Sequence, residues 1–516
     1  MNVSATMRNR VVVIGAGMGG LAAAIRLALA GYDVHVVEKE ALPGGKMRTV
    51  RTGSSNVNAG PTVFTMKWVF DRLLDGSDAK LEDIVPIAKM QTLARHFWTD
   101  GASLDLFADV EEAAAAIGEF SDRQNRDGFL RFVTDSEGIF RSLKETFIAA
   151  QRPGPIEFTQ RMGLSSFPQM LAMKPFTTMW KSLGQYFPDR RLQQLFGRYA
   201  TYCGSSPFAS PATLQLVAHV EQAGVWSVRG GMAGLAKSLA DFAAGLGVQF
   251  RYGARVTQIE TSANRVTSIV MEDDTVLPAD SVIFNGDVSA VAGLLGTNMG
   301  GPKPVPTIKR SLSAMTFCIE AEPQDFQLAH HTVFFSDAYK REFDEIFSHR
   351  RVPQSPTTYI CAQDRADDGT LLTNGKERLL CLINAPADGD THTFSEQEIA
   401  QCRKSMTSLL AQCGMTLTED NLHQVTTTPT DFAALFPSSG GALYGRASHG
   451  WMASFQRAGA KTALENFYLA GGSVHPGPGV PMAALSGMLA AESLVKDRVS
   501  TQLFQPVAIS GGTSTA

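Results

Sequence analysis

The sequence predicts an α/β protein in which a Rossmann-like nucleotide-binding domain is interleaved with a second, α+β domain. The chain has 516 residues, which is too long for one ordinary domain. Residues 11–38 follow the order strand, glycine turn, helix, strand and terminal acid. A second strand–glycine–helix pattern occupies residues 467–492. We therefore expect both ends of the chain to build the same nucleotide site.

The first of these patterns has the spacing of a dinucleotide fingerprint. Val11–Ile14 is a mostly β-branched run that indicates a buried parallel strand, and Gly15, Gly17 and Gly20 follow at G-x-G-x-x-G spacing. Gly15 suits the tight turn, Gly17 a close approach to a pyrophosphate, and Gly20 close packing of the helix on the strand. Glu38 ends the second strand and can accept hydrogen bonds from ribose hydroxyls. A βαβ unit that binds nothing is the weaker alternative. The residues assigned to the cofactor here are Gly15, Ala16, Gly17, Met18, Gly19, Gly20, Glu38 and Lys39.

The fingerprint alone does not separate NAD from FAD. Residues 43–48, PGGKMR, follow the ribose acid. This segment resembles the FAD-dependent amine oxidase and carotenoid desaturase superfamily, in which a Gly-Gly-Arg/Lys element stands at this point, and the resemblance implies FAD. Gly45 permits close passage of the backbone, and Lys46 and Arg48 can neutralise phosphate charge.

The same resemblance assigns two later segments to the cofactor. Residues 58–63, NAGPTV, are similar to a D-A-G-P-T-V element that lies along the flavin, although Asn58 replaces the usual Asp and removes its charge. The family also places the backbone of Val256 under the adenine. Residues 467–492 match its C-terminal signature, in which His475 has a structural or flavin-facing role rather than a catalytic one. These further assigned residues are Gly60, Pro61, Thr62, Val256, Gly472, Gly479, Val480, Pro481 and Met482.

The remaining patterns predict how the two domains alternate along the chain. Residues 67–224 are mostly helical in pattern, with a hairpin at 93–107, and 311–454 contain β-rich segments that suggest an antiparallel sheet. The expected division assigns 1–66, 225–310 and 455–498 to the FAD-binding domain, 67–224 and 311–454 to the substrate domain, and 499–516 to a flexible tail.

Charge and cysteine content exclude several functions. The net charge is −4 and there is no Lys/Arg-rich run, so nucleic acid is not an expected partner. The six cysteines lack C-x-x-C spacing and indicate reduced residues of a cytoplasmic protein. The ten histidines show no metal-ligand spacing, and we assign His330 and His331 to surface or strand. We expect no metal.

Two apolar runs have the hydropathy of membrane spans but contain turn residues. Residues 11–37 carry the glycine fingerprint, and 467–491 carry several glycines and prolines, so neither is expected to cross a membrane. The start of the chain is polar and is not a signal peptide. Residues 163–187 are rich in Phe, Met, Leu and Trp. They indicate a buried helix pair, an interfacial patch that touches a bilayer, or the mouth of a lipophilic tunnel.

The sequence does not identify a catalytic base. Residues 196–208 crowd Arg, Tyr, Gly and Ser into an apolar region. Arg198, Tyr199 and Tyr202 are weak candidates for lining a substrate cavity, and they are equally well explained as packing or capping residues. Ser205 and Ser206 belong to the same polar stretch.

Taken together, GAGMGGLAAAIRLALAG, PGGKMR, NAGPTV and YLAGGSVHPGPGVPMAALSG look like a bacterial carotenoid desaturase of the phytoene desaturase type. The longer stretches LARHFWTDGASLDLF and LFGRYATYCGSSPFASPATL resemble the hydroxyneurosporene desaturases of purple bacteria. The resemblance implies an amine oxidase-like fold and insertion of the C3–C4 double bond into a 1-hydroxylated acyclic carotenoid, during synthesis of photosynthetic pigments. Alternatives are a phytoene desaturase, another FAD oxidoreductase such as an amine oxidase, and a non-catalytic escort of prenylated proteins.

The chemistry implied by this resemblance also predicts partners and location. A single nucleotide fingerprint makes NAD(P)H an unlikely reductant on this chain, so we expect oxygen or a membrane quinone as the electron acceptor. A water-insoluble substrate without a spanning helix predicts peripheral attachment to the cytoplasmic face of the inner or intracytoplasmic membrane.

Overall fold

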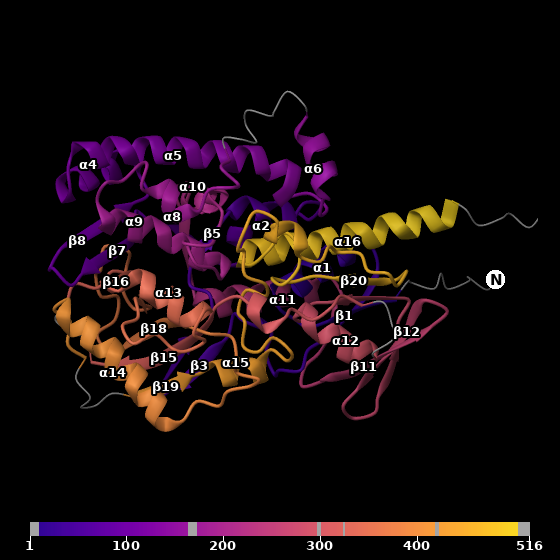
Figure 1. The fold of residues 1–516 in the computed structure, drawn as a ribbon. Coiled ribbons are helices and arrows are strands. Elements are labelled where there is room, and N and C mark those ends of the chain that lie inside the picture. The colour runs from indigo at the N-terminus through magenta and orange to yellow at the C-terminus, as the bar shows by residue number, and fades with distance from the viewer. Residues whose placement is uncertain (1–9, 164–172, 297–300, 323–325, 418–422, 504–516) are drawn as a thin grey trace, which may run out of the picture.

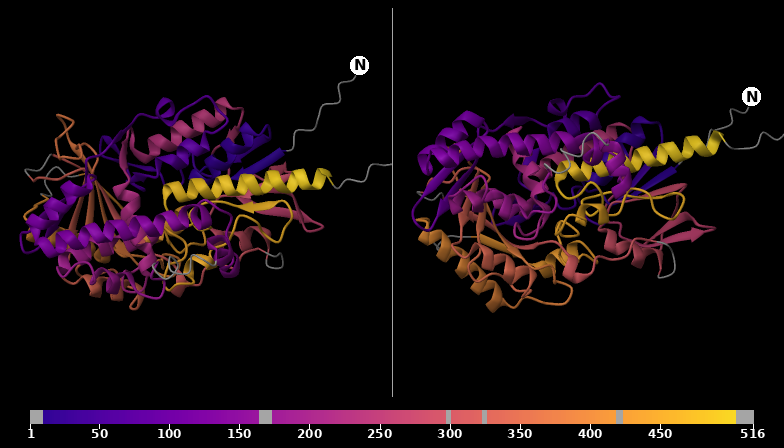
Figure 2. Two further views of the ribbon diagram at one scale, coloured as in Figure 1. Left: turned by 90° about the horizontal axis from the view of Figure 1, so that it is seen from above. Right: turned by 45° about the horizontal axis from the view of Figure 1, so that its top comes forward.

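The computed structural model describes residues 10–163, 173–296, 301–322, 326–417 and 423–503 (Figure 1). Two large sheets lie toward opposite ends of the molecule (Figure 2). The long helices α5 (Arg123–Leu143) and α16 (Val480–Leu503) run lengthwise along it.

The first sheet is parallel and has the strand order β10–β2–β1–β14–β20. Its strands are β1 (Arg10–Ile14), β2 (Asp33–Val37), β10 (Gln249–Arg251), β14 (Ser281–Phe284) and β20 (Phe467–Leu469). They come from three separate parts of the chain, as the predicted interleaving requires. The division into domains itself stays a prediction.

Side-chain alternation along β1 gives this sheet two different buried faces. Val11 and Val13 pack with the helices α1 (Met18–Leu29), α11 (Gly231–Gly245) and α16. Val12 and Ile14 belong to a core on the other face. That core also contains α12 (Val291–Leu295) and the antiparallel strands β11 (Val256–Ser262), β12 (Arg265–Met271) and β13 (Val276–Pro278). Because both faces are covered, the β-branched run of β1 is entirely apolar.

The second sheet has seven strands in the order β19–β15–β18–β17–β16–β7–β8. They are β7 (Thr92–Trp98), β8 (Ser103–Phe107), β15 (Ser313–Ala321), β16 (His331–Phe335), β17 (Thr358–Ala362), β18 (Glu377–Ala385) and β19 (His423–Thr427). The predicted hairpin at 93–107 is present as β7 and β8. The sheet is antiparallel except where β16 pairs with β7 in parallel. A hairpin from the mostly helical segment therefore extends the sheet formed by residues 313–427.

Helices cover both faces of this sheet. One face packs on α14 (Glu396–Gln412), through Cys402, Met406 and Leu410. The other packs on the helical layer of residues 110–222. The remaining helices are α2 (Lys67–Leu73), α3 (Leu81–Ile84), α4 (Val110–Phe120), α6 (Pro155–Met162), α8 (Met179–Leu183), α9 (Arg190–Gly197), α10 (Leu216–Gln222), α13 (Tyr339–Phe347) and α15 (Pro429–Leu435). Short strands complete the fold: β3 (Thr49–Thr52), β4 (Ser55–Asn58), β5 (Phe64–Thr65), β6 (Ile87–Lys89) and β9 (Val225–Val228).

The structure describes the predicted tail and the predicted apolar patch only in part. Helix α16 continues to Leu503, past the predicted start of the tail at 499, and residues 504–516 lie outside the described part of the chain. Of the apolar patch 163–187, residues 164–172 are likewise not described. Among the residues that are described, no helix combines the length and apolarity needed to cross a bilayer.

Candidate active site

The glycine turn after β1 is closed by backbone contacts that leave no room for side chains. Gly15 has a φ of +98°, and its N–H donates to the Val37 carbonyl at 2.8 Å. A Cβ atom at Gly20 would lie 2.0 Å from the Gly15 carbonyl oxygen. Helix α1 begins at Met18 after Gly17, and no described side chain caps it. Its first N–H groups are therefore available to an anion such as a pyrophosphate.

Glu38 fastens the same turn with its carboxylate. Its Oε2 accepts a hydrogen bond from the Ala16 N–H at 2.7 Å, and its Oε1 accepts one from the Glu40 N–H at 2.9 Å. Burial raises the pKa of this carboxyl group, although the two N–H donors oppose the shift. Glu38 also lines the cavity described below. Glu38, which the sequence analysis assigned to the ribose, thus also has a structural role, because it binds two backbone N–H groups of the turn.

The glycine-rich segment 43–48 lies directly on this turn. The Gly44 N–H donates to the Ala16 carbonyl at 2.9 Å, and Gly44 forms a parallel bridge with Gly17. A Cβ atom at Gly60 would lie 1.9 Å from the carbonyl oxygen of Lys46. Three segments that are separate in the sequence are therefore stacked on one another, and the contact of Gly60 with Lys46 leaves no room for a Cβ atom.

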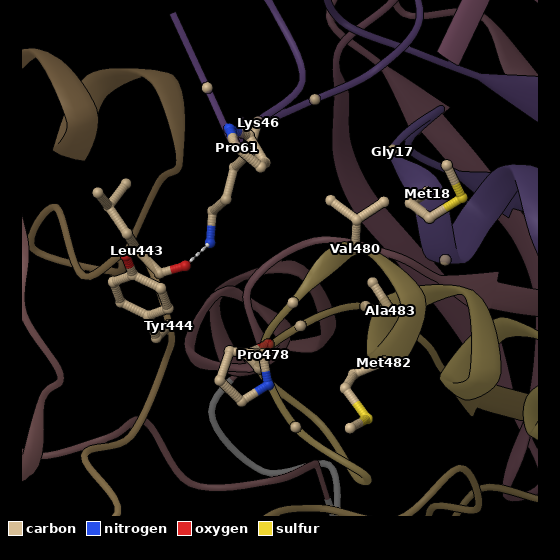
Figure 3. A pocket seen from close by; sticks show the side chains of 18 of the residues that line it. Gly17, Met18, Lys46, Pro61, Leu443, Tyr444, Pro478, Val480, Met482 and Ala483 are labelled. Atoms are coloured by element: carbon tan, nitrogen blue, oxygen red, sulfur yellow. Dashed lines mark hydrogen bonds between the residues drawn. The ribbon is translucent and has the colours of Figure 1, made fainter. Parts of the chain in front are cut away.

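The charged groups of Lys46 and Arg48 have partners other than a phosphate. Lys46 Nζ donates to the Leu443 carbonyl at 2.6 Å (Figure 3), and burial lowers its pKa. Arg48 donates to Thr427 Oγ1 at 3.1 Å, and its guanidinium lies over the Phe432 ring. Both residues line the cavity as expected. Their cationic ends also tie segment 43–48 to residues 427–443, and their assignment to a phosphate stays a prediction.

The C-terminal segment closes the groove from the other side. The Gly471 N–H donates to Ser486 Oγ at 2.7 Å, and Asn285 Nδ2 donates to the Gly15 carbonyl at 3.1 Å. Val480 and Met482 at the start of α16 line the same pocket as Gly17 (Figure 3). His475 lies outside the cavity lining, and its Nε2 is 2.9 Å from the Ala150 carbonyl oxygen. Its role here is structural, one of the two roles expected.

One cavity of about 1630 Å³ joins these parts. Every residue assigned to the cofactor lines it except Ala16 and Gly20, whose places are in the turn behind it. The groove offers backbone N–H groups at a helix N-terminus, a buried acid and closely stacked glycines. These features fit the pyrophosphate and ribose of a dinucleotide.

The cavity continues into an apolar arm. Its lining side chains come from the helical layer, and they are Leu143, Phe147, Ile148, Phe158, Met173, Leu214, Leu216, Val217 and Val220. Phe176 and Trp451 also line the cavity, yet 75% and 47% of their surfaces are exposed, and their rings lie 5.5 Å apart. They mark the place where the arm meets the surface. Such a lining suits a long hydrocarbon.

Buried and half-buried polar side chains interrupt this apolar lining at one place. We call Thr62, Arg198, Tyr202, Glu221 and Tyr359 the polar cluster; all five line the cavity. Arg198 Nη1 donates to the Tyr202 hydroxyl at 3.1 Å, and its guanidinium lies 5.0 Å from the centre of the Tyr359 ring. The Tyr359 hydroxyl is 2.7 Å from Thr62 Oγ1. Because Thr62 belongs to the segment assigned to the flavin, the cluster adjoins the cofactor part of the cavity.

The structure separates the candidates that the sequence had grouped in 196–208. Arg198 and Tyr202 line the cavity, whereas the Tyr199 hydroxyl donates to Glu221 Oε2 at 2.7 Å behind it. Ser205 Oγ accepts from the Ser448 N–H, and the Ser206 N–H donates to His449. These two serines secure a neighbouring loop and take no part in the cavity lining.

Sequence reasoning missed two buried carboxylates in the cavity, Glu221 and Glu342. Glu342 Oε2 accepts from the Thr357 N–H at 3.0 Å, Oε1 accepts from Asn384 Nδ2 at 3.4 Å, and burial raises its pKa to about 7. One turn earlier on α13, the buried Tyr339 hydroxyl has no hydrogen-bond partner among the described residues. The (i, i+3) spacing of Tyr339 and Glu342 was visible in the sequence. Their position in the cavity, where Glu342 bonds to Thr357 and Asn384, depends on the packing of α13 on distant segments and was not.

Strand pairing also brings together residues whose spacing in the sequence gave no cluster. His331 on β16 pairs with Cys361 on β17, and potential ligand atoms of His330, His331 and Cys361 lie within 4.8 Å of one another. The expectation that the histidines form no such group was therefore wrong, although His331 is in a strand as expected. That the protein needs no metal stays a prediction. All six cysteines lie in the described residues and are free.

Comparisons with known proteins agree with this geometry. The family model of flavin containing amine oxidoreductases matches residues 18–495. Hydroxyneurosporene desaturase of Rubrivivax gelatinosus is 46% identical, with 98% of this chain and 97% of that protein covered. The enzyme of that name from Rhodobacter capsulatus is 42% identical, with 95% and 98% covered. The 1-hydroxycarotenoid 3,4-desaturase of Flavobacterium sp. is 31% identical, with 94% and 98% covered.

Solved structures add evidence on the fold alone. A putrescine oxidase bound to putrescine is 12% identical and superposes with a TM-score of 0.59, covering 95% of this chain and 99% of the other. The expected amine oxidase-like architecture is thereby confirmed. The family is flavin-containing, the groove fits a dinucleotide, and the cofactor is FAD. The chain belongs to the flavin containing amine oxidoreductase family, in the group of carotenoid desaturases that includes the hydroxyneurosporene desaturases.

Proposed function

We propose that the protein is an FAD-dependent desaturase that introduces the C3–C4 double bond into 1-hydroxylated acyclic carotenoids. The observation that supports this proposal is that one cavity contains both a dinucleotide groove and a long apolar arm. The polar cluster lies beside the flavin segment of this cavity. Three relatives similar over nearly their whole lengths, named for desaturation of hydroxylated carotenoids, support the same reaction.

The apolar arm explains why a carotenoid binds, but it does not explain which carbon pair of the carotenoid lies at the flavin. Burial of apolar surface is worth about 25 cal/mol per Å², so a long polyene gains affinity wherever it lies along such an arm. A uniform hydrocarbon lining gives little reason for one carbon pair to stop at the flavin. A fixed polar group is needed to define the position of the chain.

The polar cluster supplies such a reference point. We assign the C1 hydroxyl of the substrate to Arg198 and Tyr202, the two predicted candidates that line the cavity. A substrate without this hydroxyl would leave buried donors and acceptors unpaired, at a cost of about 1–3 kcal/mol per group. Because C3 is only two bonds from C1, a hydroxyl held here keeps C3 and C4 close to the segment that contains Thr62.

FAD supplies the electron sink for the reaction, since it accepts two electrons with a hydride. The chain contributes an apolar cavity, polar groups that fix the position of the substrate, and an acceptor for the second hydrogen, which leaves as a proton. Oxygen or a membrane quinone is the proposed final acceptor, because the sequence contains a single nucleotide fingerprint.

We also infer that the protein works as a peripheral protein on the cytoplasmic face of the inner or intracytoplasmic membrane. The exposed Phe176 and Trp451 line the cavity where it meets the surface, and Ile156, at the start of α6, is 77% exposed. Exposed aromatic and aliphatic side chains at a cavity opening are suited to dip into the acyl boundary of a bilayer. A water-insoluble substrate could then enter the arm directly from the lipid.

The test is to incubate the flavin-loaded protein in parallel with phytoene, neurosporene and 1-hydroxyneurosporene and to analyse the pigments formed. The proposal predicts a new C3–C4 double bond in the 1-hydroxylated substrate. Conversion of phytoene instead would assign the chain to phytoene desaturation. A purified protein that lacks flavin absorbance but retains a prenylated peptide would favour the non-catalytic escort.

A further inference from the structure

Desaturation removes two hydrogens, and the flavin accounts for only the one that leaves as a hydride. The other leaves as a proton and needs an acceptor inside a closed, apolar cavity. We propose that Tyr359 accepts this proton while passing its own hydroxyl hydrogen to His331. The inference rests on the proposed function, and it names a residue that the sequence analysis did not single out.

Tyr359 stands where the cofactor and substrate parts of the cavity meet. It lies on β17 and lines the cavity. Its hydroxyl oxygen is 2.7 Å from Thr62 Oγ1, in the segment assigned to the flavin, and 2.7 Å from Nδ1 of His331 on β16. A single oxygen atom therefore connects the flavin segment, the cavity and a buried imidazole.

Both members of the Tyr359–His331 pair are neutral at physiological pH. Burial raises the pKa of Tyr359 well above its ordinary value. Burial also lowers the pKa of His331 well below its ordinary value, and the nearby His330 and Arg198 lower it further. If Thr62 donates to Tyr359, the phenol donates to Nδ1 of His331, and the ring keeps its hydrogen on Nε2. This arrangement is a neutral proton relay with its acceptor side open to the cavity.

The proton transfer balances as follows. After hydride departure the substrate carries a positive charge spread over the polyene. The neighbouring C–H bond breaks, its electron pair forms the new C=C bond, and the proton goes to the Tyr359 oxygen while the phenolic hydrogen moves to His331 Nδ1. A weak base is sufficient, because the substrate loses a proton from a cation and becomes a neutral alkene.

The surroundings of His331 favour onward movement of the proton. An imidazolium at His331 would be repelled by Arg198 and His330. The His330 ring lies edge-on to it, with the centroids 4.7 Å apart, and His330 is only partly buried. Burial lowers the pKa of His330, but Cys361 and the Arg365 carbonyl outweigh this effect and raise it to about 9. A group with this pKa is already protonated at neutral pH, so His330 does not take the proton but favours its departure from His331 by repulsion.

Two buried carboxylates compete for the same role, and their contacts argue against them. Glu342 accepts from the Thr357 N–H and from Asn384, and in the part of the chain that the structure describes it has no hydrogen bond to the flavin segment. Glu221 Oε2 is occupied by the Tyr199 hydroxyl. Among the described residues, Tyr359 alone is bonded to Thr62 and also to a second group that can take a proton.

The experiment compares the flavin-loaded wild type with Tyr359→Phe, His331→Gln, Glu342→Gln and Tyr32→Phe. Tyr32→Phe removes a hydroxyl outside the cavity and is the matched control. Each protein is incubated with 1-hydroxyneurosporene and a quinone as electron acceptor, and kcat, KM and the solvent deuterium isotope effect on product formation are measured. Flavin absorbance and melting temperature are recorded to show that the fold and the cofactor are retained.

We expect Tyr359→Phe to lower kcat about 10²-fold, with KM changed less than about threefold and full flavin content. His331→Gln should lower kcat less and remove the solvent isotope effect, whereas Tyr32→Phe should match the wild type. Wild-type rates in Tyr359→Phe, or a larger loss in Glu342→Gln than in Tyr359→Phe, would overturn the assignment. Failure of the wild type itself to desaturate 1-hydroxyneurosporene would instead overturn the proposed function.

Discussion

The two halves of the cavity recognise their ligands by different means. The dinucleotide groove is made of backbone: Gly15, Gly44 and Gly60 bring three chain segments together, and a single carboxylate, Glu38, fastens them. The apolar arm and the polar cluster are made of side chains that come from helices and from the seven-stranded sheet. Substitutions in the groove should therefore destabilise the fold, whereas substitutions in the arm or the polar cluster should change which substrate is converted.

The difference has a chemical cause. A pyrophosphate and a ribose always present the same charges and hydroxyls, so helix N–H groups and one acid can serve them in a fixed geometry. A hydrocarbon offers no directional contact, and its position must be set by shape and by a few polar atoms at one end. The predictions below test this contrast, from the largest expected effect to the smallest.

The groove should not tolerate even one added methyl group. Gly20→Ala would place Cβ 2.0 Å from the Gly15 carbonyl oxygen, a backbone atom that no rotamer change can move. We expect a loss of about 3 kcal/mol or more in the free energy of unfolding, and protein that retains little flavin. Thermal unfolding and flavin absorbance are the measurements. Gly138→Ala is the matched control, because its Cβ meets nothing within 4 Å inside α5, and it should be neutral or stabilising by up to about 1 kcal/mol.

Glu38→Ala should destabilise the protein even without its cofactor. The change leaves the Ala16 and Glu40 N–H groups without their acceptor. The buried Ala16 N–H should cost about 1–3 kcal/mol, and the N–H of the exposed Glu40 less, because water can replace its acceptor. Melting temperatures of flavin-free wild type, Glu38→Ala and Glu38→Gln measure this effect, and Gln should retain part of the stability. Equal melting temperatures for the three apoproteins would confine Glu38 to ribose binding.

The side-chain half should carry a strong pH dependence of its own. Burial raises the pKa of Glu342 from 4.5 to about 7. Between these values the unfolded state has already lost the proton that the folded state keeps, so stability falls as pH rises from about 4.5 to about 7, by on the order of 3 kcal/mol. Glu342→Gln should lack this contribution. Urea unfolding of both proteins at pH 5 and pH 8 gives the difference, and parallel pH profiles would show that Glu342 titrates normally.

The outer end of the arm should affect membrane binding and leave the fold intact. The double substitution Phe176→Ser, Trp451→Ser removes two exposed rings and should weaken co-sedimentation with lipid vesicles about tenfold, with little change in melting temperature. Ile308→Ser, at another exposed position, is the control and should have no effect. Wild-type binding should persist at high salt; complete release by salt would mean that charge, not apolar contact, holds the protein to the vesicle.

The same contrast explains what could be predicted from the sequence. The groove was found almost completely because its signals are local: glycine spacing, an acid at a strand end, and two further short motifs. The partners of Lys46 and Arg48 were missed because they come from residues 427–443. No spacing rule links residues so distant along the chain.

The substrate side was predicted less well for a related reason. Arg198, Tyr199 and Tyr202 are neighbours in sequence, but only the first and third line the cavity, since a tight helical turn points the second toward Glu221. Tyr359 was not singled out, and His331 was assigned to surface or strand without a role in the cavity. Tyr359 and His331 come into contact because β17 pairs with β16. The register of this pairing cannot be predicted from the sequence of either strand alone.

The most direct test of the central claim is the ratio of kcat/KM for 1-hydroxyneurosporene to that for neurosporene, measured on the wild type and on Tyr202→Phe. If buried polar side chains set the register, the wild-type ratio should be at least about tenfold, corresponding to about 1.4 kcal/mol, and Tyr202→Phe should reduce it with flavin content unchanged. A ratio near one in the wild type would contradict the account. It would mean that shape alone positions the substrate and that the chain is a general carotenoid desaturase.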